Sequence, residues 1–260
     1  MDGTNDGARG FGREDTRDTV AIYCTPQNGF AELADTYDAR LAGNPLHLLE
    51  STETLAALPD LGDRNVVDLG CGTGRYTLQL ARLGAASVTG IDLCPEMLAC
   101  AERKARRAEL PVAWRVGDLT GTLPMADATV DVAVCAVVLS FLPDLTTPFA
   151  EMARVLRSDG TLILSDHHPH GLHQARADSL GDGRQDRAPY LRFTTAGGEE
   201  RRIVQHPYRL ADLFAAATNA GLILEHLAEP VCDRRLANTY AGLRGRIGVP
   251  LALIARFRKP

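Results

Sequence analysis

The stretch that decides the fold covers residues 66–75 and reads VVDLGCGTGR. An apolar run contains the acidic residue Asp68, and three glycines follow at alternate positions, Gly70, Gly72 and Gly74. Glycine adopts positive φ readily, and without a Cβ atom it lets a ligand lie against backbone N–H groups. The stretch therefore predicts a buried strand that turns sharply over a ligand and continues into a helix.

Strand-like and helix-like segments alternate on the C-terminal side of this turn. The expected strands are 66–69, 87–92, 112–118, 130–140, 160–166, 222–230 and 250–259, with helices expected at 76–83, 95–108, 149–156 and 210–220. Strands separated by helices require a parallel, doubly wound sheet with right-handed crossovers. The expected fold class is therefore α/β, with a Rossmann-like seven-stranded sheet, its last strand antiparallel, and helices on both faces.

The remaining composition suggests additions to this core. We expect a disordered tail at 1–18, an N-terminal helical lid at 19–60, a cofactor-binding core at 61–166, an irregular insertion or acceptor lid at 167–209, and a C-terminal helix and strand pair at 210–260. The tail is rich in glycine and charge, and the insertion mixes His, Gly, Arg and Asp.

Bulk properties exclude several classes of protein. The chain has 260 residues and a formal net charge of −5, which argues against wrapping nucleic acid. Its six cysteines form no C-x-x-C pair, so neither a zinc site nor a disulfide framework is indicated. No apolar stretch is long enough to span a bilayer, and no signal-peptide core is present. We expect a cytoplasmic protein without a membrane partner.

The glycine loop argues against two phosphate-containing ligands. It lacks the G-K-[ST] of loops that cradle nucleoside triphosphates. Its third glycine comes one residue too early for the dinucleotide pattern G-x-G-x-x-G, and the Asp68 carboxylate would repel a pyrophosphate. A carboxylate at this point suits a cationic ligand better, such as S-adenosylmethionine, which carries an ammonium and a sulfonium.

Four motifs agree with that ligand. They are DLGCGTG (68–74), IDLCPEML (91–98), VGDLTGTLPMADATVDVAV (116–134) and VLSFLPDLTTPFAEMARVLRSDGTLILSD (138–166). With these motifs the chain resembles the class I S-adenosylmethionine-dependent methyltransferase family over about residues 30–166. The resemblance implies S-adenosylmethionine as the cofactor and methyl transfer as the reaction.

The resemblance also implies a set of cofactor-binding residues. Asp68 would orient the methionine amino end, Gly70, Gly72 and Gly74 would let the cofactor pass, and Asp92 would accept hydrogen bonds from the ribose hydroxyls. The spacing of Asp92 from the loop also suits a dinucleotide, so Asp92 alone does not decide between the two ligands. The remaining implied contacts are Leu93 and Met97 beside the adenine, Asp118 with Leu119 at the adenine amino group, Val137 near the sulfur end, and Tyr37 at the methionine carboxylate.

Histidines following the fifth core strand are candidates for acid–base chemistry. The run SDHHPHGLH (165–173) contains His167 and His168, and His206 comes shortly before the late helix. Histidine titrates near neutral pH, so His167 or His168 is a candidate general base, with His206 in the acceptor pocket. The same histidines could hold a metal, but neighbours on extended backbone point in different directions, and no metal is expected.

The acceptor is expected to be a small molecule. No NPPY-type tetrapeptide of base-directed methyltransferases is present, and a lid over a compact core suits a closed pocket. We expect methylation of an O, N or C atom, in specialised metabolism such as antibiotic biosynthesis, by a monomer or homodimer. The alternatives are a protein of the same fold catalysing a non-methylating reaction such as cyclisation, and, less favoured, a nucleic-acid or protein methyltransferase.

Overall fold

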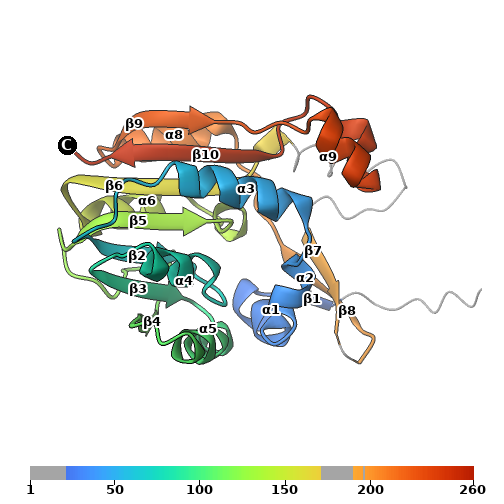
Figure 1. Cartoon of the computed structure of the whole chain (residues 1–260), viewed down its shortest axis with the longest axis horizontal. Coiled ribbons are helices and arrows are strands. Elements are labelled where there is room, and N and C mark those ends of the chain that lie inside the picture. The colour runs from blue at the N-terminus through green and yellow to red at the C-terminus, as the bar shows by residue number, and fades with distance from the viewer. Residues whose placement is uncertain (1–21, 171–189, 196) are drawn as a thin grey trace, which may run out of the picture.

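Seven strands form the central sheet of the computed structural model, which describes residues 22–170, 190–195 and 197–260 (Figure 1). In spatial order they are β4 (Ala113–Val116), β3 (Ser87–Asp92), β2 (Asn65–Leu69), β5 (Val130–Ala136), β6 (Leu156–His167), β10 (Ala252–Arg258) and β9 (Ile223–Ala228). β10 runs antiparallel to both of its neighbours, and the pairs from β4 to β6 are parallel. The predicted fold class, including the antiparallel last strand, is confirmed.

Helices cover both faces of this sheet (Figure 1). α3 and α4 pack on one face, and α6 and α8 pack on the other. The helices are α1 (Pro26–Leu33), α2 (Tyr37–Leu41), α3 (Pro45–Ala56), α4 (Arg75–Arg82), α5 (Pro95–Arg107), α6 (Thr146–Val155), α8 (Leu210–Asn219) and α9 (Arg234–Thr239), with 3-10 turns at Leu139–Phe141 and Ala241–Arg246. The expected tail at 1–18 lies outside the described residues.

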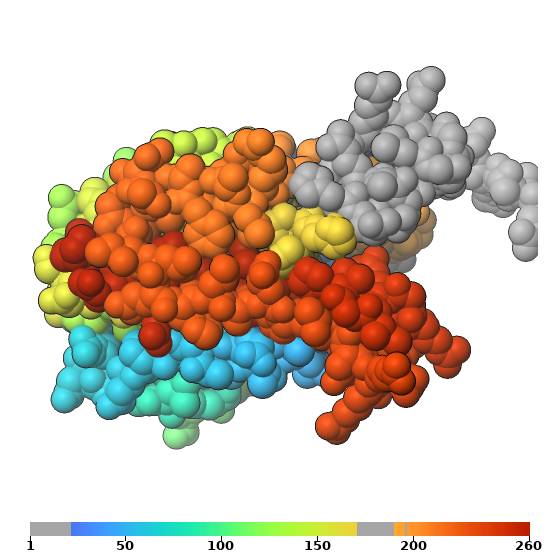
Figure 2. Space-filling model, turned by 90° about the horizontal axis from the view of Figure 1, so that it is seen from above, coloured from blue at the N-terminus to red at the C-terminus, as the bar shows by residue number. Residues whose placement is uncertain are grey.

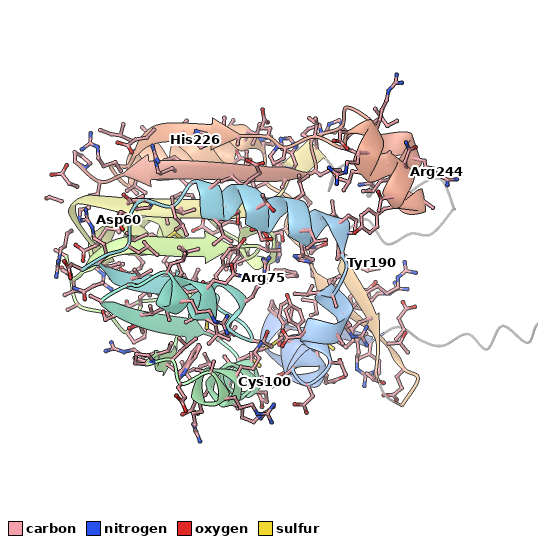
Figure 3. The ribbon with its side chains drawn as sticks, viewed as in Figure 1. Asp60, Arg75, Cys100, Tyr190, His226 and Arg244 are labelled. Atoms are coloured by element: carbon pink, nitrogen blue, oxygen red, sulfur yellow. The ribbon has the colours of Figure 1, made fainter. Side chains whose placement is uncertain are left out.

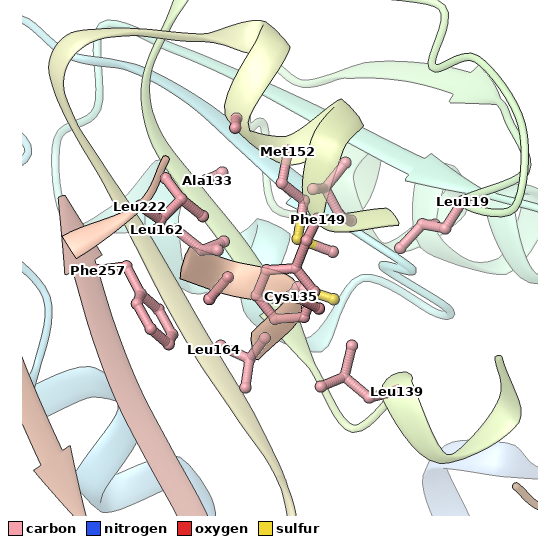
Figure 4. Packing of buried hydrophobic residues seen from close by; sticks show 14 of the residues in the cluster. Leu119, Ala133, Cys135, Leu139, Phe149, Met152, Leu162, Leu164, Leu222 and Phe257 are labelled. Carbon is pink, nitrogen blue, oxygen red and sulfur yellow. The ribbon is translucent and has the colours of Figure 1, made fainter. Parts of the chain in front are cut away.

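The central strands are buried on both faces, which explains their nearly continuous apolar sequences. Along β5, Ala133 and Cys135 face the cluster of α6 and α8, whereas Val132 and Val134 face that of α3 and α4. Phe149 of α6 meets Phe257 of β10 edge to face, with ring centroids 6.2 Å apart (Figure 4). The core therefore holds β5 rigidly between its neighbours and fixes where its carboxyl end lies.

A second, three-stranded sheet corrects the expectation of an irregular segment at 167–209. β7 (Tyr190–Thr194) and β8 (Glu200–Val204) form an antiparallel pair, and β1 (Ile22–Cys24) joins β8 in parallel. Gly29 of α1 lies so close to β8 that a Cβ atom would come within 2.4 Å of Ile203. All three strands are short, and β7 and β8 are interrupted by arginines, so they lack the apolar alternation that predicts a strand. β1 also lies far from β8 in the sequence, so their pairing could not be predicted.

The expected strand at 130–140 is too long, because the strand ends at Ala136. Val137 has φ of +59°, in the left-handed region that β-branched residues rarely occupy, and its N–H donates to the Ser165 carbonyl over 2.8 Å. A 3-10 turn at Leu139–Phe141 follows. The chain therefore bends sharply at the carboxyl edge of the sheet.

α9 and the 3-10 turn that follows it lie beside the start of α3 (Figure 2). Leu46 and Leu49 of α3 pack against the same buried apolar cluster as Leu236 and Tyr240. This contact holds the N-terminal half of α3 beside the carboxyl ends of the strands.

Candidate active site

A cavity of about 620 Å³ opens where the strand order reverses between β2 and β5. Ligands of doubly wound sheets bind beyond the carboxyl ends of strands at this point. The residues lining the cavity include these predicted ones: Tyr37, Asp68, Gly70, Gly72, Asp92, Leu93, Met97, Asp118, Leu119, Val137 and His206. Tertiary folding thus brings residues from six separate segments of the sequence to one cavity.

The glycine loop joins β2 to α4 and is held by its own backbone. The N–H groups of Gly70 and Cys71 both donate to the Ile91 carbonyl of β3, over 2.8 and 3.0 Å. Gly72 has φ of +53°, and a Cβ atom built there would meet no protein atom within 4 Å. Because Gly72 lines the cavity, that open space lies where a ligand can approach the loop backbone.

The other two loop glycines serve packing. A Cβ atom on Gly70 would come within 2.4 Å of the Val138 side chain, and one on Gly74 within 3.0 Å of Ala101. Gly74 has φ of +84° and does not line the cavity. A residue with a side chain at position 74 would therefore crowd α5 and would also have to adopt an unfavourable backbone conformation.

Asp92 ends β3 and ties its strand to the glycine loop. Its Oδ2 accepts from Gly72 N–H over 2.7 Å, and its Oδ1 accepts from Cys94 N–H over 2.9 Å. Burial raises the pKa of this carboxyl, and the backbone donors partly oppose that shift. A rigidly held acceptor group thus faces the cavity, each of its oxygens retaining a second lone pair.

Asp68 is buried beneath the loop and also lines the cavity. Thr77 of α4 donates to its Oδ2 over 2.5 Å. Burial raises the pKa of Asp68 to about 6, against the lowering effect of the Thr77 hydrogen bond. The carboxyl is therefore mostly ionised at neutral pH and places negative charge under the loop.

Asp118 follows β4 at the far side of the cavity. Its Oδ1 accepts from the backbone N–H and the hydroxyl of Thr120, over 2.8 and 2.7 Å. Met97 and Leu119 are buried, and Leu93 is partly buried. Together these residues form an apolar slot that ends in a carboxylate.

Tyr37 reaches the cavity from α2, and its neighbour Asp38 anchors that helix. Asp38 accepts from the Thr73 hydroxyl over 2.6 Å and pairs with Lys104 of α5 over 2.6 Å. Burial raises the pKa of Tyr37 to about 12, so its hydroxyl keeps its proton. The N-terminal segment is thus fastened directly to the glycine loop.

A buried ionic cluster beside the loop was not anticipated from the sequence. Glu50 of α3 is 1% exposed and accepts from Arg75 Nη2 over 2.9 Å, from the Tyr76 hydroxyl over 2.6 Å and from the Ser165 hydroxyl. Arg75, labelled in Figure 3, lines the cavity. Its guanidinium carbon lies over the Tyr76 ring, 4.4 Å from the ring centroid. Two features of the sequence could have indicated this cluster. Arg75 directly follows the glycine loop, and Glu50 is an acidic residue on the apolar face of a helix.

The three candidate histidines occupy different surroundings. His168 does not line the cavity: its Nε2 bonds Glu229 over 2.7 Å and its Nδ1 accepts from His170 N–H, which leaves no ring nitrogen for an acceptor. His167 also does not line the cavity and lies against the ring of His47, with burial lowering its pKa. His206 does line it, so the structure joins one of the three histidines to the cavity.

Sequence reasoning also overlooked His47, which lines the cavity from the first turn of α3. Burial lowers the pKa of His47 to about 4, with further lowering by His167 and Arg75. Across the described residues, no group of three His, Cys, Asp or Glu side chains is arranged to hold a metal ion. In the same residues, no helix has the length and apolar character needed to cross a bilayer.

The glycine loop, the strand-end carboxylates and the order of the strands agree with one domain family. Residues 67–164 match the family model described as a methyltransferase domain. This part of the chain is similar to methyltransferase domains. The match begins within β2 and ends within β6, so the matched segment contains the loop, Asp92, Asp118 and Val137.

Curated relatives extend the comparison. A ubiquinone biosynthesis O-methyltransferase of Xanthomonas oryzae pv. oryzae (strain PXO99A) is 34% identical over 139 residues, covering 52% of this chain and 58% of the relative. A demethylmenaquinone methyltransferase of Deinococcus radiodurans is 34% identical over 152 residues, covering 55% and 60%. The similarity thus spans less than two thirds of these relatives' length and centres on the methyltransferase domain.

A solved structure confirms the fold of the domain and its additions. The S-adenosylmethionine-dependent methyltransferase from Mesorhizobium loti superposes with a TM-score of 0.64 at 22% identity, over 84% of this chain and 99% of the other. At this identity the likeness establishes the arrangement of the chain, and the chemistry has to be argued from the residues of the cavity.

Proposed function

We propose that this chain transfers a methyl group from S-adenosylmethionine to a small organic acceptor. The observation that carries the proposal is the pairing of an open glycine, Gly72, with three carboxylates around one cavity, Asp68, Asp92 and Asp118. Carboxylates repel polyphosphates and attract cations and hydroxyl donors. The relatives named as methyltransferases support the same reaction.

The residues present fit such a cofactor. Asp92 has lone pairs for the ribose diol, and the slot of Leu93, Met97 and Leu119 suits a flat adenine. Asp118 is positioned at the end of that slot as an acceptor for an amino group. When bound, the cofactor would supply an electrophilic methyl group on a sulfonium.

We assign the methionine carboxylate of the cofactor to Arg75, with Tyr37 beside it. One terminal nitrogen of Arg75 is engaged by Glu50, and the guanidinium has further N–H donors in fixed geometry. Tyr37 keeps its proton because burial raises its pKa to about 12, so its hydroxyl can donate. Both side chains line the cavity on the side of the glycine loop.

The protein's part in the transfer is to align the acceptor, exclude water and take up a proton where the acceptor atom carries one. We propose His206 for that proton. It lines the cavity, and its backbone N–H donates to the Ser140 carbonyl over 2.6 Å, which fixes its position beside the turn after β5. His167 and His168 are less suited to this role, because neither lines the cavity.

The relatives' names concern quinones, which are small molecules, and therefore favour a small acceptor. They give no support to specialised metabolism or antibiotic biosynthesis, which stays a prediction from the sequence. A cytoplasmic location, a monomeric or homodimeric state and the absence of a nucleic-acid partner likewise remain predictions.

Calorimetric titration tests the cofactor assignment. S-adenosylhomocysteine should bind one site per chain, whereas NAD should bind at least a hundredfold more weakly. A preference for NAD would refute the methyltransferase proposal. Mass spectrometry of extracts incubated with the protein and S-adenosylmethionine, searched for products heavier by CH₂, then tests transfer itself.

A further inference from the structure

The charged side chains of the cavity gather at one end. Asp68 and Asp92 belong to the carboxyl ends of β2 and β3, Asp118 follows β4, and Arg75 opens α4. All four surround the glycine loop and the adenine slot assigned above to the cofactor. These carboxylates and this guanidinium are all assigned to the cofactor. None of them is left to bind the acceptor.

The other lining residues come largely from outside the parallel core. Leu41 and His47 belong to α2 and α3, and a further group lies on β1 and the start of α1, on the turn after β5 and at the end of β8. Figure 1 shows α1, β1 and β8 close together beyond the sheet. We call the part of the cavity lined by this further group the outer compartment. Its lining residues are Tyr23, Cys24, Thr25, Pro26, Gln27, Phe30, Phe141, Leu142, Pro143, Val204 and His206, with no Lys, Arg, Asp or Glu among them.

Aromatic rings organise the outer compartment. Phe30 and Phe141 meet edge to face with centroids 5.1 Å apart, and Phe30 meets Tyr37 in the same manner at 6.0 Å. These contacts hold the rings in place before any ligand binds. Aromatic rings that are already fixed suit a flat apolar ligand. The ligand gains contact area with the rings, and no conformational entropy is lost in immobilising them.

We propose that the outer compartment selects an acceptor that is uncharged and carries a flat apolar body about the size of one or two aromatic rings. This inference rests on the proposed function. A carboxylate, phosphate or ammonium placed there would lose its hydration without gaining an ionic partner from the lining, so its binding is disfavoured. The compartment therefore discriminates by charge first and by shape second.

Proton transfer in the outer compartment is consistent with such an acceptor. The Cys24 thiol has its pKa raised by burial and by the nearby Glu32 carboxylate, so it stays protonated. His206 is then the side chain that can accept the proton of a neutral hydroxyl. The acceptor oxygen forms its bond to the methyl carbon as the bond from that carbon to sulfur breaks, and the hydroxyl proton passes to the imidazole.

A matched set of probes tests the charge selection in wild-type protein saturated with S-adenosylhomocysteine. The probes are 2-naphthol, 2-naphthoate and 2-naphthylmethylammonium, which share one ring system and differ in charge. Calorimetry should show 2-naphthol binding at least tenfold more tightly than either ion. An ion that binds as tightly as 2-naphthol, or failure of 2-naphthol to bind, would overturn the inference.

The same titration separates this inference from the proposed function. If S-adenosylhomocysteine itself does not bind, the proposed function fails before the probes are added. If it binds and the order of the probes is wrong, only the acceptor inference fails.

A substitution provides the reciprocal test. Val204→Arg places a cation in the outer compartment, away from the charged end, and should reverse the preference so that 2-naphthoate binds at least tenfold more tightly than 2-naphthol. Affinity for S-adenosylhomocysteine should change less than twofold. Val116→Arg adds the same charge on the edge strand β4, where Val116 is 56% exposed, and should leave the preference unchanged. An unchanged preference in folded Val204→Arg protein would contradict the inference.

Discussion

The Arg75 guanidinium donates to the Glu50 carboxylate over 2.9 Å, joining the residue after the glycine loop to the middle of α3. Glu50 is 1% exposed and also accepts from Tyr76 and Ser165. One carboxylate thus ties α3, α4 and β6 together while it orients a cation toward the cavity. This relationship makes the N-terminal helices part of the site rather than a loose cover.

Removing the Glu50 charge should destabilise the protein. Glu50→Gln leaves the Arg75 cation, whose side chain is 25% exposed, without its counter-ion, and we expect the free energy of unfolding to fall by about 2–4 kcal/mol. Urea titration followed by circular dichroism measures this change. Glu102→Gln, which breaks an exposed pair with Arg106 on α5, should cost less than about 1 kcal/mol. A Glu50→Gln cost as small as that of the control would show that the buried pair contributes nothing.

Arg75→Ala should weaken cofactor binding selectively. We expect affinity for S-adenosylhomocysteine to fall by about 1.5–3 kcal/mol, because a charge-assisted hydrogen bond to its carboxylate is lost. Affinity for 5′-methylthioadenosine, which lacks the amino-acid end, should change less than twofold. Arg82→Ala, at the exposed end of the same helix, is the control and should alter neither value. Equal losses for both ligands would mean that Arg75 supports the fold of the cavity and does not contact the carboxylate.

Asp92→Ala should reduce affinity for S-adenosylhomocysteine by about 1–3 kcal/mol, through loss of the bonds assigned to the ribose. Asp92 also holds the glycine loop, so the variant's melting temperature is needed beside the calorimetric titration. Asp35→Ala removes an exposed carboxylate that pairs with Arg103 and should leave binding unchanged. Unchanged affinity in Asp92→Ala would remove the ribose assignment.

Val137→Gly should leave the stability of the protein nearly intact. A φ of +59° costs a β-branched residue about 1–2 kcal/mol, and relief of that strain offsets the flexibility that glycine adds to the unfolded chain. We expect the free energy of unfolding to change by less than about 1 kcal/mol. Val134→Gly, in the buried part of β5, should cost about 3–4 kcal/mol. Equal losses in urea titration would contradict the assignment of strain to Val137.

His47 should make stability depend on pH on the acid side. Its pKa is lowered from 6.5 to about 4 in the folded protein, so the unfolded chain binds more protons between these values. Its stabilising contribution is complete above pH 6.5 and is lost as the pH falls toward 4. Wild type should therefore lose about 1–2 kcal/mol more than His47→Gln between pH 7 and 4.5, allowing for partial exposure. His226→Gln, an exposed histidine on β9, should follow wild type, and parallel curves for all three proteins would refute the assignment.

Much of the fold follows from local patterns. The apolar runs at β2, β3 and β5 and the helices between them require a parallel sheet, and the glycines locate the turn at which its ligand sits. Asp92 and Asp118 were implied by the family resemblance, and they line one cavity because the strand ends of a parallel sheet meet at one edge. The predictions of the sheet and of the glycine turn depend on periodicity and spacing, which are properties of neighbouring residues.

Other parts of the site depend on distant pairings. Glu50 and Arg75 lie 25 residues apart in the sequence, and only the packing of α3 beside α4 joins them as a pair. His168 carries the same chemistry as His206, yet Glu229 and His170 engage both of its nitrogens. The sequence offers no spacing rule for such contacts, since their partners lie in other elements.

By itself, the sequence determined the doubly wound sheet, the glycine turn and the acidic strand ends, because hydrophobic periodicity and backbone sterics act over a few residues. Only the tertiary structure decided which histidine reaches the cavity, how Glu50 holds Arg75, and that β1 and β8 enclose an uncharged compartment. Those outcomes depend on burial and desolvation, and these arise only when segments far apart in the chain pack against one another.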